Sequence, residues 1–191
     1  MTGTRAEVQV GQRDSDDTDR LVKEWSAVVP AIDPGVERVV DRLLISARYL
    51  ERLAGSLAAK YDLQLSDYEI LARMFWVGPP HRLRPTQLAA GTMTPVTSVT
   101  SRLGRLQRRE LIRRVSDTAD GRVRSAELTD EGHTLFVRIV EQQAAAEREI
   151  FGSLPEAELD ALSGLLRTVM SHLEDRLGPA PRRVSLALDA P

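Results

Sequence analysis

The amino-acid sequence predicts a mainly α-helical fold that carries one small β-hairpin. Apolar residues recur at helical spacing over most of the chain, and two helix signals follow each other closely between residues 83 and 110. Two short extended runs then flank the turn-forming segment DTADGR. Two close helices followed by a hairpin are typical of a winged helix-turn-helix. Long apolar seams on both sides of this module predict N- and C-terminal helices that join two subunits.

The second of the two close helices, opened by Thr94 and Pro95, has two distinct faces. Its apolar positions fall on one side at about 100° per residue, so we expect them to be buried. They are Val96, Val99, Leu103 and Leu106.

The other side of this helix begins with short hydroxyls and ends with guanidinium groups. Short hydroxyls allow close approach to base edges in a DNA groove, and guanidinium groups bind phosphates or guanines. We therefore predict a DNA-binding stripe, and a merely solvated polar face is the alternative. The stripe consists of Thr94, Thr97, Ser98, Ser101, Arg105 and Arg108.

The hairpin is predicted from a strand at 112–115, a turn at 117–121 and a return strand at 123–128. Arg122 and Arg124 lie at or just past its tip. A narrow DNA minor groove concentrates negative potential, so an arginine at such a tip has a place to insert. A solvated arginine without a partner is the other interpretation.

Charge is distributed unevenly along the chain. The net charge is −2, but His81 to Leu128 contains ten arginines and four acidic residues, a net of +6, which leaves −8 for the remainder. A basic module on an acidic body is typical of DNA-binding proteins and predicts steep salt dependence.

These segments resemble one known family. DGRVRSAELT at 120–129 resembles the wing signature of MarR-type transcriptional regulators, and LRPTQLA and SRLGRLQRRELIRR resemble their helix-turn-helix. The resemblance covers about residues 36–175 and implies an obligate homodimer on double-stranded DNA with a pseudo-palindromic operator. It also implies that Arg122 contacts the minor groove and that Asp120 orients the wing. Glu110 departs from the pattern, because the family usually has glycine there.

Five regions are expected along the chain. They are a disordered tail at 1–17, an extra helix and a dimerisation helix at 18–60, the winged helix-turn-helix at 61–129, C-terminal dimerisation helices at 130–177 and a flexible tail at 178–191. Two seams support dimerisation, although each seam is also compatible with packing inside its own subunit. The seams are Val36, Val40, Leu43, Ala47, Leu50, Ala54 and Leu57, and Leu159, Leu162, Leu166, Val169, Leu173 and Leu177.

Several functions are excluded by what the sequence lacks. Without cysteine the chain has no disulfide, thiolate metal site or cysteine nucleophile. The three histidines are far apart in sequence, so we expect no metal site, no cofactor and no catalytic residues. No apolar run is long enough for a membrane span and no signal peptide is recognised, so a cytoplasmic location is expected.

Within the MarR type, the chain most resembles the urate-responsive, PecS-like branch. The features of this resemblance are KEWSAV, GPPHRLRPTQL and SRLGRLQRRELIRR. It implies an anionic-ligand site at Trp25, Glu69, Arg102 and Arg114, and release from DNA by a small aromatic or anionic ligand, with urate as a candidate. Trp25 as a helix anchor and Glu69 as the capping-box partner of Ser66 stay open as alternatives. A winged-helix protein-interaction module that needs no ligand is the alternative function.

Overall fold

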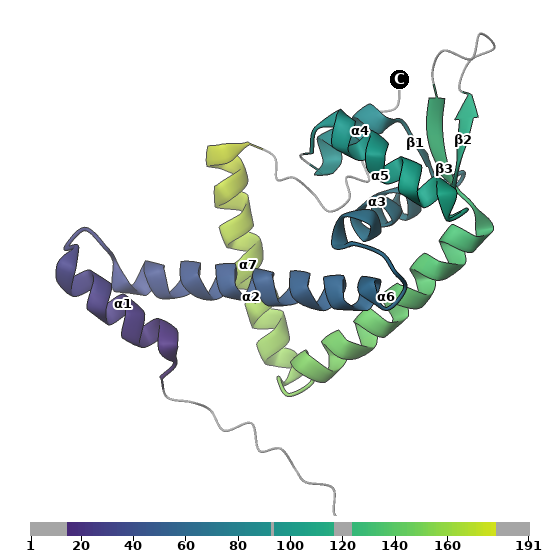
Figure 1. Ribbon diagram of the computed structural model, residues 1–191. Helices are drawn as coiled ribbons and strands as arrows, with labels where there is room; N and C mark the ends of the chain where they lie inside the picture. The colour runs from purple at the N-terminus through teal and green to yellow at the C-terminus, as the bar shows by residue number, and fades with distance from the viewer. Residues whose placement is uncertain (1–14, 93, 117–123, 179–191) are drawn as a thin grey trace, which may run out of the picture. The chain divides into compact units, whose positions relative to one another are not determined.

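The computed structural model describes residues 15–92, 94–116 and 124–178 (Figure 1). The chain divides into two compact units, Met1–Arg52 and Leu53–Pro191, and helix α2 (Pro34–Ala59) runs from the first into the second. Over the described ranges, no helix is long and apolar enough to cross a membrane.

The first unit pairs the extra helix α1 (Asp17–Val28) with the beginning of α2. A reciprocal cap starts α1, because the Asp19 N–H donates to Asp16 and the Asp16 N–H donates to Asp19, at 3.0 and 3.1 Å. Arg42 of α2 then donates to both carboxylates at 2.9 and 2.8 Å. Its hydrogen bond is the largest of the interactions that hold the pKa of Asp16 below its usual value. Helix α1 lies where the sequence places the extra N-terminal helix.

The second unit contains the helix-turn-helix, the wing and the C-terminal helices. Its elements are α3 (Leu65–Trp76), β1 (Arg82–Leu83), α4 (Pro85–Thr92), α5 (Val96–Arg108), β2 (Ile112–Ser116), β3 (Arg124–Leu128), α6 (Asp130–Phe151) and α7 (Glu156–Leu177). The mainly helical winged helix-turn-helix is thus confirmed. The turn expected at 117–121 lies outside the described residues.

The wing has one strand more than the hairpin that the sequence predicts. The sheet is antiparallel with the order β1-β3-β2, in which Arg82 pairs with Glu127, and Ile112 with Leu128. The extra strand β1 is only two residues long, so it leaves no periodic pattern in the sequence. Pairing with β3 ties the segment before α4 to the wing.

The core of the second unit fills the space between the helices and one face of this sheet. Its largest fully buried side chains include Ile70, Leu71, Met74, Leu88, Leu103, Leu106, Ile112, Phe136 and Ile139. At Gly132 the start of α6 lies so close to the backbone of Leu111 that an added Cβ would be 2.0 Å from the Leu111 carbonyl oxygen. Thr129 caps the same helix by accepting from the Gly132 N–H at 3.0 Å, and its hydroxyl donates to the Glu110 carbonyl at 2.7 Å.

The predicted capping box of Ser66 and Glu69 is wrong. Helix α3 begins at Leu65, and the Gln64 N–H donates to the Asp67 carboxylate at 3.2 Å. The acidic residue that caps α3 is therefore Asp67, two positions earlier than the sequence pattern suggests.

The two apolar seams are only partly covered within the described chain. In α2, Ala54 and Leu57 are buried, whereas Val36 and Val40 are 57% and 40% exposed. No residue of α7 is buried, and Leu177 at its end is 80% exposed. Packing inside one subunit thus accounts for the end of the α2 seam and leaves the other seam positions partly or largely open to water.

Candidate nucleic-acid interface

Helix α5 has the two faces that its sequence predicts. Val99, Leu103 and Leu106 have no exposed surface, while Thr97, Ser101 and Arg108 are exposed on the other side. Thr94 and Ser98 are half-buried, and the Thr94 hydroxyl donates to the Thr92 carbonyl at 3.0 Å.

Val96 differs from the prediction, because it is 43% exposed and not part of the core. It is the first residue of α5, ahead of the turns that pack on the rest of the unit. The exposed end of the helix therefore combines an apolar side chain with the hydroxyls.

Arg105 faces α3 within its own subunit. Its guanidinium donates to the buried Asp67 carboxylate at 2.8 Å and to the Gln64 side chain at 3.2 Å, while its Nε is buried without a hydrogen-bond partner. Asp67 also caps α3, so one carboxylate joins the start of α3 to α5. In this arrangement Arg105 positions the helix, and the prediction that it contacts DNA stays a prediction.

The end of α5 is held by a second arginine. Arg109 donates to the carbonyls of Tyr61 and Asp62, at 2.7 and 2.6 Å, in the segment before α3. Glu110 follows with a φ of 59°, the left-handed conformation that glycine adopts most easily. Glu110, which stands where the family pattern has glycine, therefore keeps the left-handed backbone conformation.

A buried carboxylate connects the three strands of the wing. Glu127 of β3 accepts hydrogen bonds from Arg82 of β1, with Nε at 2.7 Å, and from Arg113 of β2, with Nε at 2.9 Å. Burial is the largest single effect on the pKa of Glu127 and raises it. The hydrogen bonds and charges of Arg113 and Arg82 lower it, and together they outweigh burial, so the pKa lies below its usual value. The cluster keeps two guanidinium groups on the sheet with one negative charge between them.

The predicted wing residues are described only in part. Asp120 and Arg122 lie outside the described residues. Arg124 is the first residue of β3 and pairs with Ser116, which places its backbone beside the end of β2.

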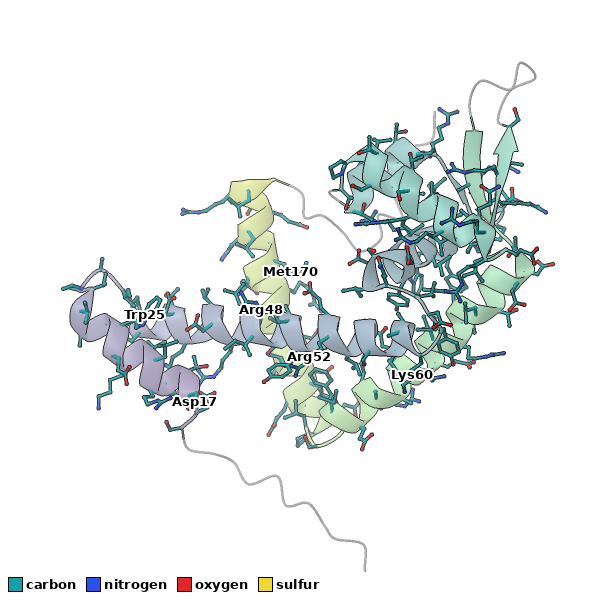
Figure 2. All side chains as sticks on the ribbon, viewed as in Figure 1. Asp17, Trp25, Arg48, Arg52, Lys60 and Met170 are labelled. Carbon is teal, nitrogen blue, oxygen red and sulfur yellow. The ribbon has the colours of Figure 1, made fainter. Side chains whose placement is uncertain are left out.

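The four predicted ligand residues lie on different elements. Trp25 lies on α1 in the first unit (Figure 2). Its exposed fraction is 56%. Glu69 is exposed on α3, Arg102 is half-buried on α5, and Arg114 is half-buried on β2, where it pairs with the buried Ala126.

Glu69 acts electrostatically on its own helix. Burial lowers the pKa of Arg73, and the charge of Glu69 one turn earlier raises it, with burial the larger effect. With the capping role assigned to Asp67, Glu69 remains a surface carboxylate beside a partly buried arginine.

Sequence reasoning missed the histidine pair of the second unit. It treated the three histidines as separate, but the rings of His81 and His133 lie 5.4 Å apart, centre to centre. His81 and His133 both pack against Phe75 of α3, so their contact depends on tertiary packing and no local pattern in the sequence signals it.

Comparisons with known proteins identify the family. The chain matches no protein-family model. It is 31% identical over 153 residues to the HTH-type transcriptional regulator PecS of Dickeya dadantii, a match that covers 80% of this chain and 92% of that protein. The chain belongs to the MarR family and is PecS-like. It is therefore a DNA-binding transcriptional regulator and not an enzyme.

Other MarR-type proteins agree with this assignment. The HTH-type transcriptional regulator PrsX of Escherichia coli is 24% identical over 163 residues, covering 84% of this chain and 96% of that protein. Among solved structures, the MarR-family regulator AbsC of Streptomyces coelicolor has the same fold, with a TM-score of 0.59 at 24% identity over 74% of this chain and 96% of AbsC. Sco3205 of the same organism, solved in complex with DNA, has a TM-score of 0.60 at 25% identity, covering 77% of this chain and 93% of Sco3205.

Proposed function

We propose that a homodimer of this chain represses transcription by binding a pseudo-palindromic operator in double-stranded DNA. One helix α5 enters the major groove of each half-site, and each wing enters the adjacent minor groove, with half-sites about one helical turn apart. The observation that carries this proposal is the two-sided character of α5. Val99, Leu103 and Leu106 are fully buried on one side, while Thr97, Ser101 and Arg108 are exposed on the other. A repressor of this kind acts in the cytoplasm.

Roles follow from the chemistry of each side chain. Thr97 and Ser101 approach base edges, and Arg108 binds phosphate or guanine. Exposed Val96 supplies an apolar contact for a thymine methyl group. We propose the same roles as the sequence predicts for the other residues. Thr94, Ser98 and Arg105 contact DNA from the stripe, Arg122 and Arg124 contact it from the wing, and Asp120 orients the wing.

Dimerisation is supported by the apolar side chains that the single chain leaves open. Val36 of α2 is 57% exposed, and Leu173 and Leu177 of α7 are 50% and 80% exposed. Burial of such side chains against a second copy removes them from water. Sedimentation equilibrium at micromolar concentration should give the mass of two chains, and a monomer would contradict the proposal.

The DNA proposal is tested with the wing residue Arg122. Each phosphate contact contributes about −0.9 to the slope of log K against log salt concentration. Replacing Arg122 with Ala should weaken binding to all sequences and flatten this slope. An unchanged slope would count against the wing assignment.

A protein-interaction module that does not read DNA is the competing function, and it makes a different prediction. A gel shift should show that the DNA upstream of this protein's own gene binds more tightly than random DNA of the same length. Equal binding, or none, would favour the interaction module.

We further propose that a small aromatic or anionic ligand, urate being the candidate, releases the protein from DNA. An indole and two guanidinium groups suit a flat anion, by stacking and by paired hydrogen bonds. Trp25, Arg102 and Arg114 supply these groups, and Glu69 contributes a carboxylate. Such a ligand weakens DNA binding by the difference in its affinity for the free and bound states.

Urate titration tests the ligand proposal. Urate should quench tryptophan fluorescence and release the operator fragment. The combined substitution of Trp25→Phe and Arg102→Ala should abolish the release while DNA binding without urate persists. A full response in that variant, or no response to urate and other planar anions, would refute the ligand site and leave the DNA proposal standing.

A further inference from the structure

Two histidines from distant parts of the sequence come together at the base of the wing. His81 precedes β1, and His133 lies in the first turn of α6. Their ring centres are 5.4 Å apart with an angle of 54° between the ring planes. Phe75 of α3 contacts both rings, and its ring centre lies 5.7 Å from that of His81 and 5.0 Å from that of His133. The Phe75 ring therefore packs against both imidazoles.

The hydrogen bonds of His81 determine which of its nitrogens carries a proton. Nδ1 lies 3.2 Å from the Met74 carbonyl oxygen and 3.0 Å from the Phe75 carbonyl oxygen. A carbonyl oxygen only accepts, so Nδ1 carries the hydrogen, and in the neutral ring Nε2 keeps its lone pair. Donation of one ring N–H to a backbone carbonyl is the usual arrangement of a metal-bound histidine.

The separation of the two rings also matches shared coordination. A nitrogen-to-zinc bond of about 2.0 Å places the metal about 3.2 Å from the ring centre, so two rings at a tetrahedral angle have centres about 5.2 Å apart. The observed separation is 5.4 Å. Within the described part of the chain, the His133 ring makes no hydrogen bond, and both histidines are half-buried.

We propose that His81 and His133 together form a binding site for a divalent transition-metal ion, represented by Zn²⁺. The described residues contain no group of three or more histidines and carboxylates that would hold a metal, so the protein supplies two imidazoles and water completes the coordination. Imidazole ligands favour zinc, copper and nickel over magnesium and calcium, which prefer oxygen. A bound ion would join the segment before β1 to the start of α6.

Zinc titration of the untagged full-length protein tests the site. Isothermal titration calorimetry should detect one strongly bound Zn²⁺ per chain in the wild type. His81→Gln and His133→Gln should each weaken binding at least about tenfold, since loss of a ligand should cost no less than loss of an outer-shell partner, which costs about 10–100-fold. His172→Gln, on the exposed surface of α7, is the matched control and should bind like the wild type. Equal binding by all three variants, or no zinc binding by the folded wild type, would overturn the proposal.

Nuclear magnetic resonance of the wild type gives a second measurement that needs no variant. Added Zn²⁺ should shift the ring resonances of His81 and His133 together, with saturation at one ion per chain, and leave His172 unchanged. Shifts confined to His172, or spread equally over the three histidines, would contradict the site even if a variant failed to fold.

Discussion

Replacing Asp67 with Asn tests whether Arg105 fixes α5 to α3. The Asp67 side chain is 5% exposed and accepts from the Arg105 guanidinium at 2.8 Å and from the Gln64 N–H at 3.2 Å. Asparagine keeps the shape and removes the charge. Hydrogen bonds to charged groups contribute about 1.5–3 kcal/mol, so the free energy of unfolding should fall by about 2 kcal/mol. For a chain of this length, the Tm should fall by about 4–8 °C.

The assay is thermal and urea unfolding followed by circular dichroism at one fixed protein concentration, because dimer stability depends on concentration. Arg105→Ala and the double variant complete a cycle in which the pair should show a coupling of about 1–2 kcal/mol. Asp175→Asn, at an exposed position on α7, is the control and should change stability by less than about 0.5 kcal/mol. A loss below about 0.5 kcal/mol in Asp67→Asn, or strictly additive effects, would refute the role given to Arg105.

Three further predictions concern stability. Gly132→Ala should lower the free energy of unfolding in urea by about 3 kcal/mol, because the new Cβ would lie 2.0 Å from the Leu111 carbonyl oxygen. The control Gly104→Ala, whose nearest neighbour is 3.7 Å away, should leave this free energy unchanged or raise it. Equal effects of the two substitutions would contradict the packing at Gly132. The pKa of Glu127 is lower in the folded state than its ordinary value of 4.5, so its contribution to stability is present above that pH and is lost as the pH falls through the folded pKa. Glu127→Gln should therefore be less stable than the wild type at pH 7, and the difference should shrink in acid unfolding below pH 4.5; a constant difference would argue against the ion cluster. Glu110→Gly should raise the free energy of unfolding by about 1 kcal/mol, since glycine adopts a φ of 59° without a Cβ penalty, and a lower Tm would show that the Glu110 side chain offsets the strain.

The fold could be predicted because its long elements have regular apolar faces. In α5, three of the four positions expected in the core are fully buried. Apolar residues at helical spacing lie on one face of a helix, and that face packs against the core. The exception, Val96, stands at the first residue of the helix, where periodicity says nothing about whether a neighbour is present. Strand β1 was missed because two residues cannot show an alternating pattern.

The contacts within the site could not be read from local spacing. Arg105 and Asp67 are 38 positions apart, and the helical pattern of α5 marks Arg105 only as lying off the apolar face. Which polar side chain of α5 binds the buried carboxylate of Asp67 depends on how α3 and α5 pack together. The pairing of His81 with His133 depends in the same way on tertiary packing. Sequence therefore predicted the elements and the exposure of Thr97, Ser101 and Arg108 on α5, whereas the partners of Arg105 and of the two histidines depend on tertiary packing.

The most direct test of the proposed interface is the salt dependence of operator binding by Arg108→Ala. Arg108 is exposed on the outward stripe of α5, and the matched control, Arg138→Ala, removes an equally charged exposed side chain from α6. Because Arg108→Ala removes one phosphate-binding guanidinium from each subunit of a dimer, the slope of log K against log salt should become shallower by about 1.8, and it should stay unchanged for Arg138→Ala. Identical slopes for the wild type and Arg108→Ala would contradict the assignment of this helix face to DNA.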